Sequence, residues 1–322
     1  PHSDEFYTLC DREGMLVWAE IPLVGKALDT PEFTENMKTE LTELIRQNFN
    51  HPSIFCWSLC NELSKGDVKG LISELNDVSH REDPGRLTVL AANVEKRPEN
   101  AVPDIMAFNT YPGWYWAEPS EMKSTLERWN RQCGNKGIAV SEYGAGANVW
   151  HHWQTGKKTP KVDGVFHPEE WQATVHEQTY DAIKRSGFAW GSFVWNMFDF
   201  ASASRNEGDM PGMNDKGLVS YDRKIRKDAF YFYQSEWSEE PVVHIASRRD
   251  VARRDSLTDV KVYTNCETVR LKVNGKDCGS PERNGSICIW RKVGLKHGEN
   301  QVEAFGQRGG QEFSDCCKWV LF

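Results

Sequence analysis

Two glutamates each follow a short apolar run with one or two residues between, a position in which a strand of the protein can present a carboxylate to a substrate. Glu62 follows the run "SIFCWSL" at residues 53–59, and Glu142 follows "GIAV" at residues 137–140. Glycoside hydrolysis requires two carboxylates on one rim, one as general acid and the other as nucleophile or base. Glu20, which ends "MLVWAE", is a third candidate. A single glutamate in such a position is more often a helix cap or a surface charge than a catalytic group. Whether these glutamates are catalytic therefore depends on the strands and helices that carry them.

Short apolar runs alternate with helical patterns along the N-terminal part of the chain, which is the rhythm of β-strands joined by helices. The run at residues 53–59 places large side chains on both alternating faces, as a covered strand of a parallel sheet does. In a parallel α/β barrel the carboxyl ends of all strands open onto one face, where the catalytic groups of such enzymes lie. Six strands are predicted, ending at or near Glu20, Asn61, Asn93, Tyr111, Glu142 and Asp199.

The segment before Asn50 has the clearest helical pattern. Thr30 can cap a helix, and Pro31 occupies a first-turn position where its missing N–H costs nothing. Apolar side chains then recur at spacings of three and four as far as Phe49, and Pro52 ends the pattern. We expect one helix from residue 31 to about residue 49 that buries a single stripe.

Aromatic and histidine side chains near the predicted strand ends have two interpretations. Tyr111, Trp114 and Trp116 are either part of the core or surfaces on which the apolar face of a sugar stacks. His151 and His152 are adjacent in the chain and lack the spacing of metal ligands, so no metal site is expected.

The composition excludes several classes of partner. With 39 basic and 47 acidic residues, a net charge of -8 and a pI near 5.7, the chain offers no electrostatic footprint for nucleic acid or anionic membranes. No apolar run approaches the roughly 20 residues of a membrane-spanning helix, and the opening "PHSDEF" lacks the features of a signal peptide. The nine cysteines show no paired CxxC spacing and are expected to be mostly buried thiols, with one disulfide after residue 260 left open.

Three separated motifs carry a resemblance to one enzyme family. They are "NHPSIFCWSLCNE" (residues 50–62), "SEYG" (141–144) and "VWNMFDFASASRNEGDMPGMNDKGLVSYDRKIRKDAFYFYQSEW" (194–237), and they occur in the family's order. Together they resemble glycoside hydrolase family 2, close to its bacterial β-galactosidases, from Pro1 to about Trp237. The resemblance implies a (β/α)8 TIM barrel and retaining chemistry.

The resemblance also implies roles for individual residues. Glu62 would be the general acid and base, and Glu142 would be the nucleophile of a double displacement. The match also implies four residues that surround the substrate. Asn61 would contact the hydroxyl next to the reacting carbon, and Tyr111 would contact the nucleophile. Trp195 would form a stacking wall, and His152 would contact the sugar.

The motifs leave the substrate between two members of the family. Asn214 and Lys216 fit the Asn-x-Lys pattern by which glucuronidases hold the substrate carboxylate, whereas "WNMFDF" followed by "RNEGD" is more similar to the galactosidase branch. We therefore expect a retaining exo-β-galactosidase, with β-glucuronidase as the alternative. A non-catalytic carbohydrate-binding or scaffold fragment is the alternative from another class.

Two departures from the family pattern modify these expectations. Metal-dependent β-galactosidases of the family carry Glu and His where this chain has Val24 and Lys26, so we expect no catalytic magnesium and no cofactor. The family's first two barrel strands have no counterpart, so residues 1–238 are expected to hold the third to eighth strands of an incomplete barrel from a longer protein. Open sheet edges would make the isolated chain inactive and prone to aggregation unless other polypeptide completes it.

The C-terminal residues 239–322 have a different pattern. Apolar and polar residues alternate with a period of two, and Asn274-Gly275 is a strong hairpin signal, so an immunoglobulin-like β-sandwich is expected. Its expected role is structural, with carbohydrate binding as the functional alternative. The expected partner of the whole chain is a carbohydrate substrate, a homo-oligomer is left open, and a periplasmic or extracellular location is favoured over the cytoplasm.

Overall fold

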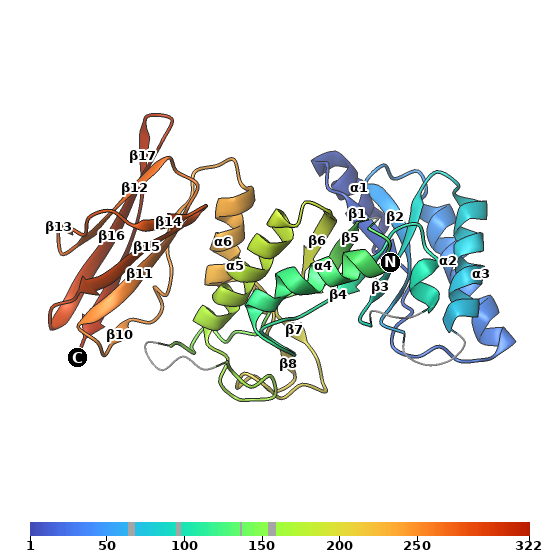
Figure 1. Cartoon of the computed structure of the whole chain (residues 1–322), viewed down its shortest axis with the longest axis horizontal. Coiled ribbons are helices and arrows are strands. Elements are labelled where there is room, and N and C mark those ends of the chain that lie inside the picture. The colour runs from blue at the N-terminus through green and yellow to red at the C-terminus, as the bar shows by residue number, and fades with distance from the viewer. Residues whose placement is uncertain (64–67, 95–97, 136, 154–158) are drawn as a thin grey trace. The chain divides into compact units, whose positions relative to one another are not determined.

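The structure, a computed structural model, describes residues 1–63, 68–94, 98–135, 137–153 and 159–322 (Figure 1). The chain divides into two compact units, and each is described on its own. The first unit comprises Pro1–Thr110, Glu121–Tyr143 and Ala182–Phe193, and the second comprises Tyr111–Ser120, Gly144–Asp181 and Val194–Phe322. The predicted division into a catalytic domain at 1–238 and a sandwich at 239–322 stays a prediction.

A six-stranded sheet forms the centre of the first unit. Neighbouring strands from β1 to β5 pair in parallel, and the spatial order follows the chain order, as in the wall of a TIM barrel. In the strand order of the described residues, β1 and β6 are the two ends. The strands are β1 (Val17–Glu20), β2 (Ile54–Asn61), β3 (Leu87–Ala92), β4 (Ala107–Asn109), β5 (Ile138–Tyr143) and β6 (Ala189–Val194).

Side chains between the two end strands show that this sheet is curved. Trp18 of β1 stacks on Trp190 of β6 with ring centroids 6.4 Å apart. The same interior is lined by small buried side chains of the strands between them: Cys56, Val89, Ala107 and Ala139. The sheet therefore bends until its first and last strands meet through tryptophans.

Helices α1 (Asp4–Glu13), α2 (Pro31–Asn48), α3 (Val68–Glu82) and α4 (Met122–Gln132) belong to the same unit, with a short 3-10 turn at Pro98–Ala101. A second 3-10 turn, Pro119–Glu121, lies at the boundary of the two units in the chain. The prediction for α2 is confirmed, since the Thr30 hydroxyl accepts a hydrogen bond from the Phe33 N–H at 3.2 Å. Figure 1 shows α2 and α3 side by side, where Arg46 pairs with Glu82 at 2.7 Å.

One predicted strand is shorter than expected. The run predicted to end near Asp199 stops as β6 at Val194, and β7 (Phe200–Ala201) pairs antiparallel with β8 (Met213–Asn214). The physical reason lies in Asp199, a buried carboxylate that accepts the Gly217 N–H at 2.8 Å and pairs with Lys227 at 2.8 Å. A buried carboxylate needs such partners, and a continuing parallel strand would not supply them.

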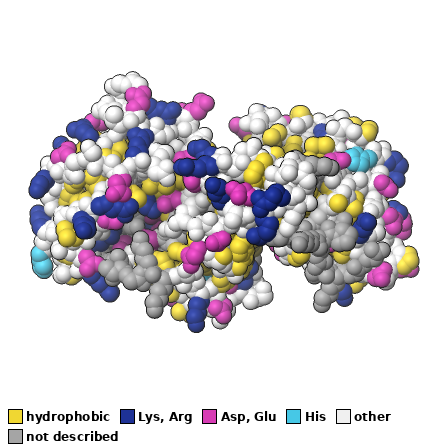
Figure 2. Space-filling view, viewed as in Figure 1, with side chains coloured by type: hydrophobic (Ala, Val, Ile, Leu, Met, Phe, Trp, Pro, Cys, Tyr) yellow, Lys and Arg dark blue, Asp and Glu magenta, His cyan; other side chains and the backbone are white. Residues whose placement is uncertain are grey.

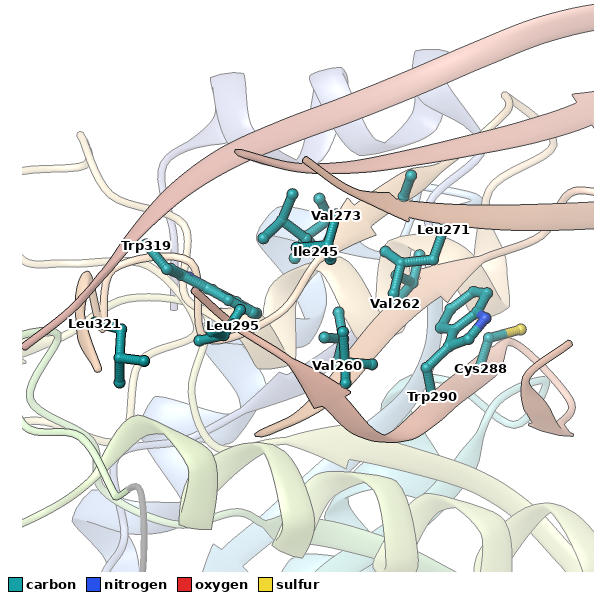
Figure 3. Packing of buried hydrophobic residues seen from close by; sticks show 13 residues of the cluster. Ile245, Val260, Val262, Leu271, Val273, Cys288, Trp290, Leu295, Trp319 and Leu321 are labelled. Atoms are coloured by element: carbon teal, nitrogen blue, oxygen red, sulfur yellow. The ribbon is translucent and has the colours of Figure 1, made fainter. Parts of the chain in front are cut away.

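The second unit contains most of helix α5 (Glu169–Arg185), helix α6 (Asp228–Trp237) and two facing sheets, which are antiparallel except for the parallel pair of β10 and β17. Figure 3 shows the apolar core between the sheets, which includes Val260 and Trp290 from one sheet and Leu271 from the other. The sheet orders are β10-β17-β16-β12-β13 and β14-β15-β11-β9. The strands are β9 (Val243–Ile245), β10 (Ala252–Arg253), β11 (Leu257–Thr264), β12 (Thr268–Val273), β13 (Lys276–Asp277), β14 (Glu282–Asn284), β15 (Ile287–Gly294), β16 (Gly298–Arg308) and β17 (Gln311–Leu321).

Two further expectations can be compared with this unit. The hairpin at Asn274-Gly275 is confirmed, because both residues have positive φ (53° and 77°) and join β12 to β13. All nine cysteines are free thiols, so the disulfide left open after residue 260 is not formed. Among the described helices, none combines the length and the apolar character needed to cross a membrane.

Candidate active site

The end of β2 presents Glu62 through an irregular backbone. The β2–β3 pairing shifts register between Ser58 and Asn61, and Glu62 adopts a left-handed φ of 52° while its N–H donates to the Ala91 carbonyl at 2.9 Å. Such irregularities at strand ends re-aim a side chain, and they are frequent next to active sites. The Glu62 carboxylate is consequently half-buried rather than enclosed in the sheet.

Asn109, the last residue of β4, joins the two predicted catalytic glutamates. Its Nδ2 donates to Glu62 Oε1 at 2.8 Å and to Asn61 Oδ1 at 2.9 Å. Its Oδ1 accepts a hydrogen bond from the Ser141 hydroxyl at 2.7 Å, and Asn109 is the pairing partner of Glu142 in the β4–β5 ladder. The Glu62 carboxylate is therefore oriented by the strand that lies beside Glu142.

Glu142 lies near the carboxyl end of β5 and is half-buried. Its carbonyl accepts the Thr110 N–H at 2.8 Å, which extends the β4–β5 pairing beyond Asn109. Three of the residues predicted from the sequence, Asn61, Glu62 and Glu142, thus lie at the carboxyl ends of strands of one parallel sheet. That is the edge on which barrel enzymes place their catalytic groups.

Glu20, the third candidate carboxylate, is held inside the sheet. Its Oε2 accepts hydrogen bonds from the Ser58 hydroxyl at 2.5 Å and from Trp18 Nε1 at 3.1 Å. Burial raises the pKa of Glu20, and these two hydrogen bonds offset part of the rise. Its partners belong to β1 and β2, so this carboxylate connects two strands of the wall.

In the second unit, two of the predicted substrate-contacting residues come together. Tyr111 and Trp114 are buried in an apolar cluster with Ala145 and Val175, and Trp195 packs against this cluster. Tyr111 and Trp195 therefore line one apolar region, as a stacking wall for a sugar would require.

Lys216 is the most unusual residue of this unit. Its side chain is 1% exposed, yet Nζ has no hydrogen-bond partner within the described part of the chain. The ammonium lies 5.6 Å from the ring centroid of Trp114 and 5.2 Å from that of Tyr115. Glu207 is 3.9 Å away, beyond hydrogen-bond distance, because its carboxylate instead binds Arg205 at 2.6 Å.

Lys216 is flanked by residues with well-defined partners. Asn214 is buried, and its Oδ1 accepts the backbone N–H of Lys216 at 3.1 Å, so the predicted Asn-x-Lys pair forms one turn. Asp215 and His167 form a buried pair at 2.6 Å. Burial alone would raise the pKa of Asp215, but the hydrogen bond with His167 and nearby lysines bring it below its ordinary value.

His152 makes its polar contact with a different element. Its Nδ1 lies 2.9 Å from a carboxylate oxygen of Glu170, in the first turn of α5. Burial lowers the pKa of His152, but the hydrogen bond with Glu170 and the charges of Glu170, Glu169 and Asp250 together raise it above its ordinary value. The predicted sugar contact of His152 stays a prediction.

Asn109, Arg205 and Glu207 are among the residues of these clusters that were not predicted from the sequence. Asn109 was visible only as a polar residue near a predicted strand end, and Arg205 and Glu207 only as letters of the "RNEGD" motif. Which residues these side chains contact depends on where they point in the folded structure, because their partners come from other segments of the chain. In the described ranges, no group of three or more His, Cys, Asp or Glu side chains is arranged to hold a metal ion.

Comparison with known proteins identifies the class of this chain. The model of "Glycosyl hydrolases family 2, TIM barrel domain" matches residues 1–239, so the chain belongs to glycoside hydrolase family 2. A second model, "Domain of unknown function (DUF4982)", matches residues 255–314. The resemblance to this family and the prediction of a TIM-barrel wall followed by a β-rich region are confirmed.

Similar proteins within this family carry the names of two enzymes, β-glucuronidase and β-galactosidase. A β-glucuronidase of Bacteroides fragilis is 42% identical over 313 residues, which cover 94% of this chain and 45% of that protein. A solved structure from Bacteroides fragilis, provisionally described as a β-galactosidase, has a TM-score of 0.94 at 34% identity and covers 99% of this chain and 48% of its own. An FMN-binding β-glucuronidase from Faecalibacterium prausnitzii has a TM-score of 0.91 at 35% identity and covers 100% of this chain and 49% of its own. The chain spans about half the length of these relatives.

Proposed function

We propose that the protein containing this chain is a retaining β-glucuronidase, which removes terminal β-linked glucuronic acid. The sequence motifs alone placed β-galactosidase first and β-glucuronidase second. The buried ammonium of Lys216 reverses that order, and the names of the similar curated proteins point the same way.

The observation that carries this proposal is the unused hydrogen-bonding capacity of Lys216. A buried ammonium without hydrogen bonds is unfavourable by several kcal/mol unless an anion reaches it. Glu207 cannot fill this role while it binds Arg205 at 2.6 Å and stays 3.9 Å from Lys216 Nζ. A carboxylate on the substrate would supply a charged acceptor, whereas the C6 hydroxyl of a galactoside could accept a hydrogen bond but would bring no negative charge, and Glu207 stays 3.9 Å away.

The chemistry assigned to the first unit is a double displacement. Glu142 would attack the anomeric carbon as the bond to the leaving oxygen breaks, and Glu62 would give its proton to that oxygen. Glu62, now ionised, would then take a proton from water as the water attacks the glycosyl-enzyme and releases Glu142. Asn109, at 2.8 Å from Glu62 Oε1, would keep that carboxylate oriented in both steps.

A panel of aryl β-glycosides tests the proposal. The 322-residue chain and the longest gene product that contains it are assayed in parallel on 4-nitrophenyl β-glucuronide, β-galactoside and β-glucoside. We expect kcat/KM for the glucuronide to exceed that for the other two by at least about 100-fold, the effect of losing a charged, buried hydrogen bond. Equal or higher kcat/KM for the galactoside would contradict the proposal.

A further inference from the structure

The second unit contains a cavity of about 360 Å³ that none of the predicted catalytic or substrate-contacting residues lines. Glu170 and Thr174, from the first turns of α5, form one side, and Thr258 and Lys261 of β11 with Arg291 of β15 form the other. The cavity reaches residues of the domain of unknown function, and its volume lies at the lower end of the range for small-molecule sites.

One side chain that lines this cavity has a hydrogen-bond donor without a partner among the described residues. Arg253 lines the cavity and is 5% exposed, and its guanidinium stacks 3.8 Å over the ring of Trp319, which Figure 3 shows in the core of the sandwich. Nη2 donates to the Ser247 carbonyl at 2.9 Å, but the buried Nε has no hydrogen-bond partner within the described ranges. The carboxylate of Asp250 is 3.6 Å from Nη1, too far for a hydrogen bond.

The other cations of the cavity are already paired. Lys261 binds Glu177 at 2.7 Å, and Arg291 binds Asp259 at 2.7 Å. A buried guanidinium N–H without a partner costs free energy, so Arg253 is the lining cation with hydrogen-bonding capacity that the described residues leave unused.

The walls indicate the chemistry of such a ligand. They carry three cationic and four anionic side chains, a charge balance that disfavours a phosphate or another multiply charged anion. They also offer hydroxyls from Ser247, Thr174 and Thr258, and the indole of Trp153. Alternating donors and acceptors beside an aromatic ring suit a ligand with many hydroxyl groups and an apolar ring face.

We propose that this cavity, which none of the predicted catalytic residues lines, is a second carbohydrate site that binds one or two neutral sugar units of a glycan. A hydroxyl or ring oxygen of the sugar accepts a hydrogen bond from the guanidinium of Arg253, and carboxylates of the wall accept hydrogen bonds from the hydroxyls of the sugar. On the face drawn in Figure 2, Lys and Arg side chains are interspersed with Asp and Glu, and the lining residues of the cavity have the same mixed character.

Ligand-observed NMR and calorimetry on the full 322-residue chain test this site, with cellobiose and maltose as probes. All proteins carry Glu142→Gln so that no probe is hydrolysed. Thr258→Trp fills the cavity from a half-buried strand position, and Arg253→Lys keeps the charge but removes Nε. Arg254→Lys, next in the chain and outside the lining residues, is the matched control.

We expect Thr258→Trp and Arg253→Lys each to raise Kd for at least one of the two disaccharides by at least about tenfold, and Arg254→Lys to leave it unchanged. If Arg253→Lys fails to fold, Thr258→Trp decides. Binding that survives Thr258→Trp would belong to the catalytic residues and would overturn the proposal. Absence of binding at about 20 mM, or displacement of both sugars by equimolar inorganic phosphate, would overturn it as well.

Discussion

The two units hold their candidate functional groups by different means. In the first unit, Glu62 is half-buried and oriented by the amide of Asn109 at 2.8 Å, a neutral donor at the end of β4, two strands along the sheet from β2. In the second, Lys216 is 1% exposed, and its nearest carboxylate, Glu207 at 3.9 Å, is committed to Arg205. The Glu62 carboxylate is partly in contact with water. The Lys216 ammonium, in contrast, is buried and has no hydrogen bond to an anion among the described residues.

This difference implies that the first unit determines the rate of the reaction and that the surroundings of Lys216 determine which substrate is used. Changes to the strand ends of the first unit should reduce the rate on every substrate, because the groups there would act on the anomeric carbon that all glycosides share. Changes around Lys216 should alter the choice of substrate, because only a uronic acid offers a carboxylate to it.

The largest effect is expected for the two glutamates. Glu142→Gln should lower kcat by at least roughly 10⁴-fold on every aryl glycoside that the protein cleaves, because an amide cannot act as the nucleophile. Glu62→Ala should lower kcat by about 10²- to 10⁴-fold on poor leaving groups and little on dinitrophenyl glycosides, which need no protonation. Glu5→Gln on the exposed face of α1 is the control. Equal losses for Glu62→Ala on both kinds of leaving group would refute its role as the acid.

A smaller effect on rate is expected for the residue that orients Glu62. Asn109→Ala removes a hydrogen bond to a carboxylate, an interaction of about 1.5 to 3 kcal/mol, and should lower kcat about 10- to 100-fold with little change in KM. Asn36→Ala is the matched control, since Asn36 donates the same kind of hydrogen bond to Glu40 at 2.8 Å on the exposed surface of α2. If Asn109→Ala acts only through KM, or no more strongly than Asn36→Ala, the positioning role fails.

The sequence predicted the first of these regions better than the second. Glu62 and Glu142 follow apolar runs whose ends must meet at one edge of a parallel sheet, so their placement required only the strand pattern. The role of Asn109 required knowledge of where its amide points across neighbouring strands. The surroundings of Lys216 lie in an irregular segment, where the predicted strand ends early at Val194 because Asp199 turns to meet Lys227.

The smallest effect is expected in the stability of the first unit. There His51 and Asp11 form an ion pair at hydrogen-bond distance, whereas Lys216 Nζ has no hydrogen-bond partner within the described residues. His51 contacts Asp11 at 2.6 Å, and this hydrogen bond raises the pKa of His51 above its ordinary value of 6.5, against the effect of partial burial. Because the folded pKa is raised, the stabilisation is fully present below about pH 6.5 and is lost as pH rises through the folded pKa.

His51→Gln should therefore destabilise the protein more at pH 5.5 than at pH 8.5, with a difference of about 0.5 to 1 kcal/mol in the free energy of unfolding. Urea unfolding at the two pH values measures it, and His297→Gln, on the exposed surface of the sandwich, is the control. A loss that is equal at both pH values, or greater at pH 8.5, would contradict the assigned role of the Asp11 pair.

If Lys216 selects a carboxylated sugar, its replacement should change the ratio of kcat/KM for 4-nitrophenyl β-glucuronide to that for the β-galactoside. Lys216→Met keeps the length and apolar body of the side chain, and Lys224→Met removes an exposed lysine that lies 3.7 Å from Asp222. We predict that Lys216→Met lowers the ratio by roughly 100-fold through the glucuronide alone, while Lys224→Met leaves it unchanged. Equal loss on both substrates, or a wild-type ratio that already favours the galactoside, would contradict the account.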